Sequence, residues 1–101
     1  MQTKEYTQLL TDKDKLRISF TKDKGKILKF VVQYYSLTGS RWRTIMRIDN
    51  YHGFPHRHVY HLRKKELKVI LSGDTNTAFT ESKAYILKNF RRIKENYLFS
   101  K

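Results

Sequence analysis

The sequence predicts an α+β domain: an antiparallel meander of four to five strands packed by a C-terminal helix. Two observations lead to this prediction. Through most of residues 16–71, apolar and polar residues alternate with a period of two, as they do in half-buried strands. From residue 80 onward the apolar residues recur at helical spacing, and no glycine or proline interrupts them. Successive strands followed by a helix are typical of the α+β class.

The N-terminal segment, residues 1–15, is polar and mixed in charge. Tyr6, Leu9 and Leu10 fall at helical spacing after Thr3, which is a suitable cap, so a short N-terminal helix is predicted. No linker, repeat or low-complexity tract interrupts the chain, and residues 1–101 are expected to form a single domain.

The first two strands are expected on either side of a turn at residues 22–25, where Gly25 supplies the backbone freedom that a hairpin needs. The first strand carries alternating apolar residues between Leu16 and Phe20. The second strand, residues 26–35, has apolar residues on both faces, which predicts a central strand covered on both sides. Its predicted core face holds Leu28, Phe30, Val32 and Tyr34.

The third strand is predicted from Arg41 to Asp49. Residues two apart on a strand share a face, so Arg41, Arg43 and Arg47 are expected along one surface. Trp42 then falls on the opposite, apolar face and is expected in the core. Guanidinium groups bind phosphate oxygens in a bidentate manner, so the three arginines predict a phosphate-binding stripe. The alternative is a solvated polar face that binds nothing.

The remaining elements are a histidine-rich stretch, a short strand and the final helix. The stretch from Tyr51 to His61 is expected to be part loop and part strand, and a last strand covers residues 67–71. Residues 72–78 are expected to form a polar loop, with Thr80 as the helix N-cap. The apolar stripe of the helix is Phe79, Ile86, Phe90, Ile93 and Tyr97, supported by Leu87.

Composition narrows the function. The chain has 22 Lys and Arg against 9 Asp and Glu, a net charge of +13, and no cysteine. The charge predicts an anionic partner, above all nucleic acid. The absence of cysteine excludes disulfides and thiolate chemistry. Neither a signal peptide nor a membrane-spanning stretch is evident, so a cytoplasmic protein without a membrane partner is expected.

All four histidines lie between His52 and His61. His56 and His58 share a strand face and suit either a metal site or a pair of acid–base groups. A metal site would need a further ligand, so no metal or other cofactor is predicted. In metal-independent RNA cleavage, His56 and His58 would act as base and acid, Arg47 would stabilise charge, and Asp49 would orient a neighbour. The alternative is that the histidines only contact RNA or pack a loop. The predicted nucleic-acid contacts are Arg41, Arg43, Arg57, Tyr51 and Phe54.

A short motif resembles the TumE family of toxin-type proteins from prokaryotic toxin–antitoxin pairs. It consists of a strand end, a histidine-bearing loop, a Pro-His-x-His step and a Phe-Thr step before the last helix. The matching positions are Arg47, Asp49, Asn50, His52, Pro55, His56, His58, Phe79 and Thr80. The resemblance implies a toxin role and a helix-turn-helix antitoxin as partner. Together with the charge, it leads us to expect an RNA-directed toxin-like protein, with a metal-independent endoribonuclease as the catalytic form. The alternative is a non-catalytic module that binds nucleic acid or inhibits a protein.

Overall fold

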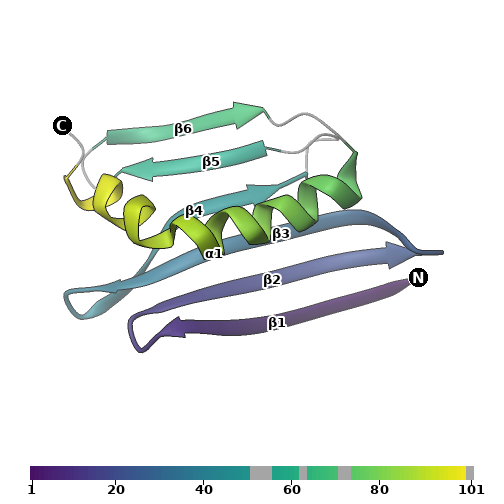
Figure 1. Cartoon of the computed structure of the whole chain (residues 1–101), viewed down its shortest axis with the longest axis horizontal. Coiled ribbons are helices and arrows are strands. Elements are labelled where there is room, and N and C mark those ends of the chain that lie inside the picture. Colours follow the sequence, from purple (N-terminus) through teal and green to yellow (C-terminus); the bar gives the residue numbers. More distant parts are fainter. Residues whose placement is uncertain (51–55, 62–63, 71–73, 100–101) are drawn as a thin grey trace.

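Six antiparallel strands form one sheet in chain order, and a single helix crosses one face of it (Figure 1). The computed structural model describes residues 1–50, 56–61, 64–70 and 74–99. The predicted meander packed by a C-terminal helix is confirmed, with one strand more than expected. The elements are β1 (Gln2–Thr11), β2 (Asp14–Asp23), β3 (Lys26–Thr38), β4 (Arg41–Asp49), β5 (His56–His61), β6 (Lys64–Ile70) and α1 (Thr75–Phe99).

The predicted N-terminal helix is wrong, because residues 2–11 form the edge strand β1. This strand pairs with β2 from Gln2 opposite Lys22 to Thr11 opposite Asp14. A ten-residue helix with few apolar residues is marginal on its own, whereas pairing with β2 satisfies the backbone N–H and C=O groups directly. Of its apolar residues, Leu10 packs against the core.

The core lies between α1 and one face of the sheet. Leu16 and Ile18 from β2 and Val32 from β3 are fully buried, as the period of two predicts. From α1, the supporting residue Leu87 is 41% exposed, but the buried side chains include all five residues of the predicted stripe. Those residues are Phe79, Ile86, Phe90, Ile93 and Tyr97.

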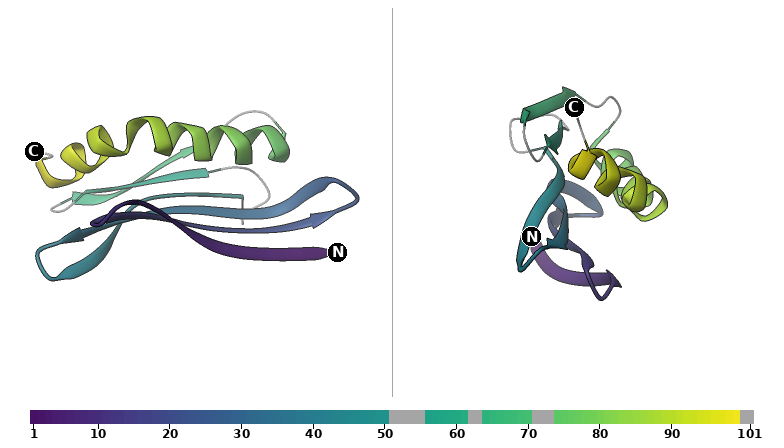
Figure 2. Two further views of the ribbon diagram at one scale, coloured as in Figure 1. Left: turned by 60° about the horizontal axis from the view of Figure 1, so that its bottom comes forward. Right: turned by 90° about the vertical axis from the view of Figure 1, so that its left-hand side faces the viewer.

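The opposite face of the sheet has no second layer in the part of the chain that the structure describes, and Figure 2 shows α1 on one side only. We call this surface the open face. The prediction that β3 is covered on both sides is therefore wrong. Val31 and Tyr35 point to the open face and are only half-buried.

The helix begins at Thr75, five residues before the predicted cap at Thr80, so residues 75–78 are not loop. Asp74 is the actual N-cap: its Oδ1 accepts a hydrogen bond from the Thr77 backbone N–H at 2.8 Å. The hydrogen bonds from the backbone N–H and the hydroxyl of Thr77 hold the pKa of Asp74 below its ordinary value. Asn76 ties the first turn to the β2–β3 turn, because its side chain accepts from Ile27 N and donates to Gly25 O.

A β-bulge in β4 reverses which residues face the helix. Tyr34 lies opposite Met46 and Tyr35 opposite Thr44, so Ile45 is an extra residue on β4. One inserted residue exchanges the two faces of every position beyond it. The strand from Arg41 to Thr44 is therefore turned over relative to the strand from Met46 to Asp49.

A second bulge, on β3, changes the core in the same way. Thr21 pairs with Lys29 and Lys22 with Ile27, which leaves Leu28 as the extra residue. Leu28 was expected in the core but is 45% exposed, and Ile27 packs against the core instead. Within the described residues, no helix is long and apolar enough to cross a membrane.

Candidate nucleic-acid interface

The bulge at Ile45 divides the predicted arginine stripe between the two faces of the sheet. Arg47 lies opposite Gln33, whose side chain is on the open face. Arg43 lies opposite Ser36, which is buried on the helix side. Arg41 lies on the helix side with Arg43, so the prediction of one surface for all three arginines is wrong.

Asp49 is the centre of the site that remains on the open face. Its side chain is almost fully buried, and its Oδ2 accepts a hydrogen bond from Arg47 Nε at 2.8 Å. The same oxygen lies 3.2 Å from Nε2 of His58, on the neighbouring strand β5. A buried carboxylate is stable only when cations or donors surround it, so Asp49 holds Arg47 and His58 in place.

Three of the four predicted catalytic residues are thus brought together, and strand register explains how. Arg47 lies opposite His58 in the β4–β5 pair, and Asp49 lies opposite His56. The side chain of His56 is outside the described residues. The side chain of His58 is only 10% exposed, and its contact with Asp49 fixes its position beside Arg47.

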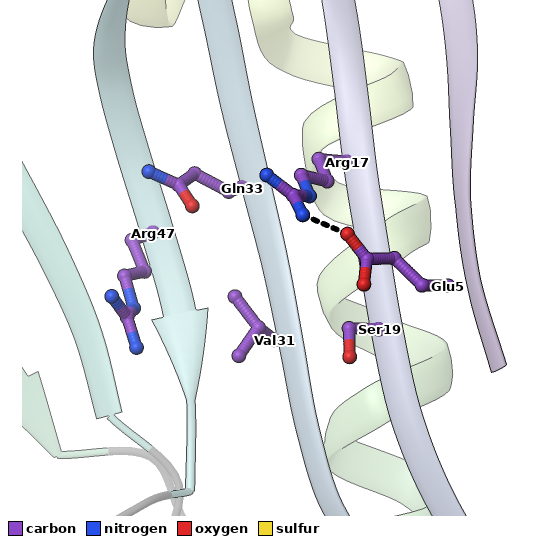
Figure 3. Close-up of a pocket in the computed structure, with 6 residues that line it drawn as sticks. All are labelled: Glu5, Arg17, Ser19, Val31, Gln33 and Arg47. Atoms are coloured by element: carbon purple, nitrogen blue, oxygen red, sulfur yellow. Dashed lines mark hydrogen bonds and ion pairs between the residues drawn. The ribbon is translucent and has the colours of Figure 1, made fainter. Parts of the chain in front are cut away.

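Arg17 on β2 extends the site across the sheet. Arg17 lies opposite Gln33, and Gln33 lies opposite Arg47, so the three form one row across neighbouring strands. Adjacent strands are about 4.8 Å apart, which places the two arginine backbones roughly 10 Å apart. Figure 3 shows Arg17 and Arg47 on either side of Val31 and Gln33, with an ion pair between Arg17 and Glu5.

These residues line a shallow depression of about 250 Å³ on the open face. Its lining, from β1 to β4, combines two guanidinium groups, an amide, a hydroxyl and one apolar side chain with the Glu5 carboxylate, which is paired with Arg17. The lining residues are Glu5, Arg17, Ser19, Val31, Gln33 and Arg47. Such a surface suits a phosphate or sugar better than an apolar ligand.

An aromatic and cationic patch adjoins this depression. Trp42 was expected in the core but is 41% exposed on the open face, because it lies beyond the bulge. The Lys15 ammonium is 4.1 Å from the centroid of the Trp42 ring and 5.7 Å from that of Tyr35. Proteins bind single-stranded nucleic acids with such groups: bases stack on the aromatic rings, and cations contact the phosphates.

Asn50, which belongs to the motif, supports the fold. It is buried, and its Oδ1 accepts from Phe30 N while its Nδ2 donates to Leu28 O, both at 2.9 Å. β4 ends at Asp49, so the Asn50 side chain supplies the backbone partners that β3 would otherwise lose. Its position fixes the end of β4, where Asp49 lies.

The other predicted contacts are elsewhere. Arg57 lies on the helix side with its guanidinium over the Tyr85 ring, 5.0 Å from the centroid. Tyr51 and Phe54 lie outside the described residues, as do His52 and Pro55 of the motif. The described residues include no group of three or more His, Asp or Glu side chains placed to hold a metal ion.

Lys15, Arg17 and Gln33 were not singled out from the sequence. Lys15 and Arg17 alternate with Leu16 and Ile18, so the rule that predicts a buried face also predicts a basic face. Their convergence with Arg47 depends on the register of three strands, and no local signal in the sequence carries it.

The fold and the site define a small basic α+β protein with one sheet face packed by a helix and the other face open and cationic. The whole chain, residues 1–101, matches the family described as Domain of unknown function (DUF7718), and the chain belongs to that family. No curated protein matches the sequence, and no solved structure matches it.

Proposed function

We propose that the protein binds single-stranded RNA on the open face of its sheet. The observation that carries the proposal is the row Arg17–Gln33–Arg47 beside the exposed Trp42, all on one uncovered surface. Phosphates would contact the guanidinium groups, and unpaired bases would stack on the aromatic rings.

The buried Asp49 supports this proposal through Arg47. A long, flexible arginine normally loses conformational entropy when it binds a phosphate. The hydrogen bond from Arg47 Nε to Asp49 orients the guanidinium before any ligand arrives, which lowers that cost. A guanidinium held in this way is a better phosphate ligand than a solvated one.

Arg47 and Arg43 provide a matched test, because they have the same charge on the same strand and opposite faces. We expect Arg47→Ala to weaken binding of a single-stranded RNA oligonucleotide about tenfold and to lower the salt slope by about 0.7. Arg43→Ala should change the affinity less than about twofold, because salt screens the interaction of the RNA with one charge on the other face. The measurement is fluorescence anisotropy of labelled RNA across a series of salt concentrations.

Trp42 supplies an independent readout, since it is the only tryptophan of the chain. Bound RNA should quench its fluorescence, and Trp42→Ala should weaken binding by about 1–3 kcal/mol if a base stacks on it. Equal losses for Arg47→Ala and Arg43→Ala, with no change in Trp42 fluorescence, would refute binding on the open face.

RNA cleavage without a metal is the second candidate function, and the contact of Asp49 with both Arg47 and His58 favours it. A base would take the 2′-hydroxyl proton, and the 2′-oxygen would attack the adjacent phosphorus. The bond to the 5′-oxygen would break as an acid returns a proton to it, leaving a 2′,3′-cyclic phosphate and a 5′-hydroxyl. Arg47 would stabilise the added negative charge, and Asp49 would orient the His58 imidazole.

Cleavage is tested by incubating the protein with RNA in EDTA. We expect 2′,3′-cyclic phosphate ends from the wild type, and at least about a hundredfold slower cleavage from His56→Ala and from His58→Ala. Circular dichroism checks that each variant is folded, and Arg43→Ala is the control for charge. RNA that stays intact with the wild type, while Arg47-dependent binding persists, would leave the binding function alone.

The TumE resemblance supports a biological setting for either function. On that basis the protein is a toxin-type member of a toxin–antitoxin pair, and a helix-turn-helix protein encoded beside it neutralises it. Co-expression with the neighbouring reading frame tests this setting: growth arrested by the protein alone should resume when the neighbour is present.

A further inference from the structure

A groove on the helix side of the sheet remains outside the RNA proposal. It lies between α1 and strands β4 and β5, with a volume of about 230 Å³. Ile45 and Ile93 are among its apolar lining residues, and Arg57, Arg92 and Asn96 are polar ones. None of the described lining residues is acidic.

Arg57 is the distinctive side chain of this groove. Its guanidinium stacks over the Tyr85 ring, with 5.0 Å between Cζ and the ring centroid. Its Nε is buried, and no described residue supplies that N–H with a hydrogen-bond acceptor. A buried N–H of a charged group is costly to leave unpaired, so Arg57 is suited to bind a further hydrogen-bond acceptor.

Arg92 places a second cation in the groove. One of its terminal amino groups donates to Asn89 Oδ1 at 3.1 Å, which restrains the side chain along α1. Two guanidinium groups beside Tyr85 and Ile93 form a site that is cationic and apolar at the same time. Charge complementarity then selects an acidic ligand that also carries apolar groups.

We propose that this groove binds an acidic peptide segment of a partner protein, with a Glu or Asp carboxylate on Arg57 and an apolar side chain against the edge of Tyr85 and the accessible part of Ile93. A carboxylate matches the fork of a guanidinium in a bidentate pair, and stacking on Tyr85 holds the plane of Arg57 ready for it. The proposal is independent of RNA binding, because the groove and the open face lie on opposite sides of the sheet.

A peptide fits these observations better than RNA does. RNA carries a phosphate on every nucleotide and gains affinity from a track of cations, as on the open face. The groove instead has one stacked arginine (Arg57), a second arginine (Arg92) and apolar walls. Its volume is enough for one or two side chains. A single carboxylate with an adjacent apolar residue matches that size and chemistry.

The test is a titration of the ¹⁵N-labelled full chain with an acetylated heptapeptide of alternating Glu and Leu. We expect the amide signals of Tyr85 and Asn96 to shift and saturate, while the Trp42 indole signal, which reports on the open face, stays in place. Arg57→Gln and Arg92→Gln should each weaken binding about tenfold. Lys88→Gln removes the same charge from an exposed position of α1 and should change binding less than about twofold.

Three controls decide between ligands. The same peptide with Gln in place of Glu should bind at least about tenfold more weakly, and inorganic phosphate should not saturate the Asn96 signal at the same concentrations. Arg57→Lys keeps the charge but loses the fork, so it should also weaken binding. Arg92 lies on the exposed surface of α1, and Arg92→Gln therefore keeps the test valid if Arg57→Gln fails to fold.

The proposal is overturned if the Glu and Gln peptides bind equally or if the peptide shifts the Trp42 indole instead. It is also overturned if RNA or phosphate occupies the groove as tightly as the peptide does. These results do not affect the RNA proposal, because RNA binding is measured through Trp42 fluorescence and through the Arg47→Ala variant.

Discussion

Asp14 is a buried carboxylate on the helix side, and it joins three elements through its hydrogen bonds. Thr11 and Tyr34 donate to it at 2.6 Å and Ser36 donates at 2.8 Å, while the Lys94 ammonium of α1 lies 3.8 Å away. Burial opposes ionisation, yet these donors hold the pKa of Asp14 below its ordinary value of 3.8. Burial first, and then Asp14 itself, raises the pKa of Tyr34.

Removing the carboxylate should therefore destabilise the fold. We expect Asp14→Ala to lower the free energy of unfolding by about 2–4 kcal/mol, because the buried hydroxyl groups of Tyr34 and Ser36 and the half-buried hydroxyl of Thr11 each lose an acceptor. The measurement is urea unfolding followed by circular dichroism. Lys15→Ala, on the same strand but the open face, is the control and should change stability by less than about 1 kcal/mol.

The same group makes stability depend on pH in a defined direction. Since the pKa of Asp14 is lower in the folded state than in the unfolded state, its stabilisation is fully present above the ordinary value and is lost as pH falls through the folded one. The stability difference between wild type and Asp14→Ala should narrow as pH falls from about 5 to about 3. A difference that stays constant over this range would contradict a charged Asp14 in the folded protein.

Strand β4 and helix α1 each contain a feature that the local sequence pattern does not predict. In β4, the extra residue Ile45 is itself fully buried, so packing against α1 stabilises the bulge. In α1, the first turn begins at Thr75 because Asp74 caps it and Asn76 bonds to the β2–β3 turn. Thr80 has the residue type of a cap but lies within the helix, where the backbone N–H groups already have partners.

The two cap candidates give opposite expectations. Asp74→Ala removes the acceptor for the Thr77 N–H and should lower the melting temperature. Thr80→Ala replaces a β-branched residue at an exposed helical position and should leave the melting temperature unchanged or raise it. Thermal unfolding followed at 222 nm compares the two. If only Thr80→Ala lowered the melting temperature, the helix would begin after Thr80 and not at Thr75.

For the whole molecule, the two faces of the sheet have separate roles. One face and α1 share the core, and the other carries the Arg17–Gln33–Arg47 row and Trp42. A six-stranded meander with a single packed helix has one apolar layer, so α1 supplies one side of the core and the sheet supplies the other. The open face can then carry polar and cationic residues without any loss of core packing.

The contribution of α1 can be measured with two adjacent residues. Ile86 is fully buried against the sheet, and Ile86→Ala should cost about 3 kcal/mol of stability. Leu87, the next residue, is exposed, and Leu87→Ala should cost less than about 1 kcal/mol. Urea unfolding of the two variants is the comparison, and similar losses would mean that α1 packs on a different stripe.

The sequence by itself determined the meander, the C-terminal helix and its buried stripe, because each depends on a periodicity that is local in the chain. It also indicated Arg47, Asp49, His56 and His58 as members of one site, of which the structure brings Arg47, Asp49 and His58 together. Only the tertiary structure decided which residues lie on which face of the sheet. The bulge at Ile45 depends on packing against α1, and it moves Arg41 and Arg43 away from Arg47 and brings Trp42 out of the core. A period of two predicts a face only while the register continues, and a single extra residue, placed by distant contacts, reverses it.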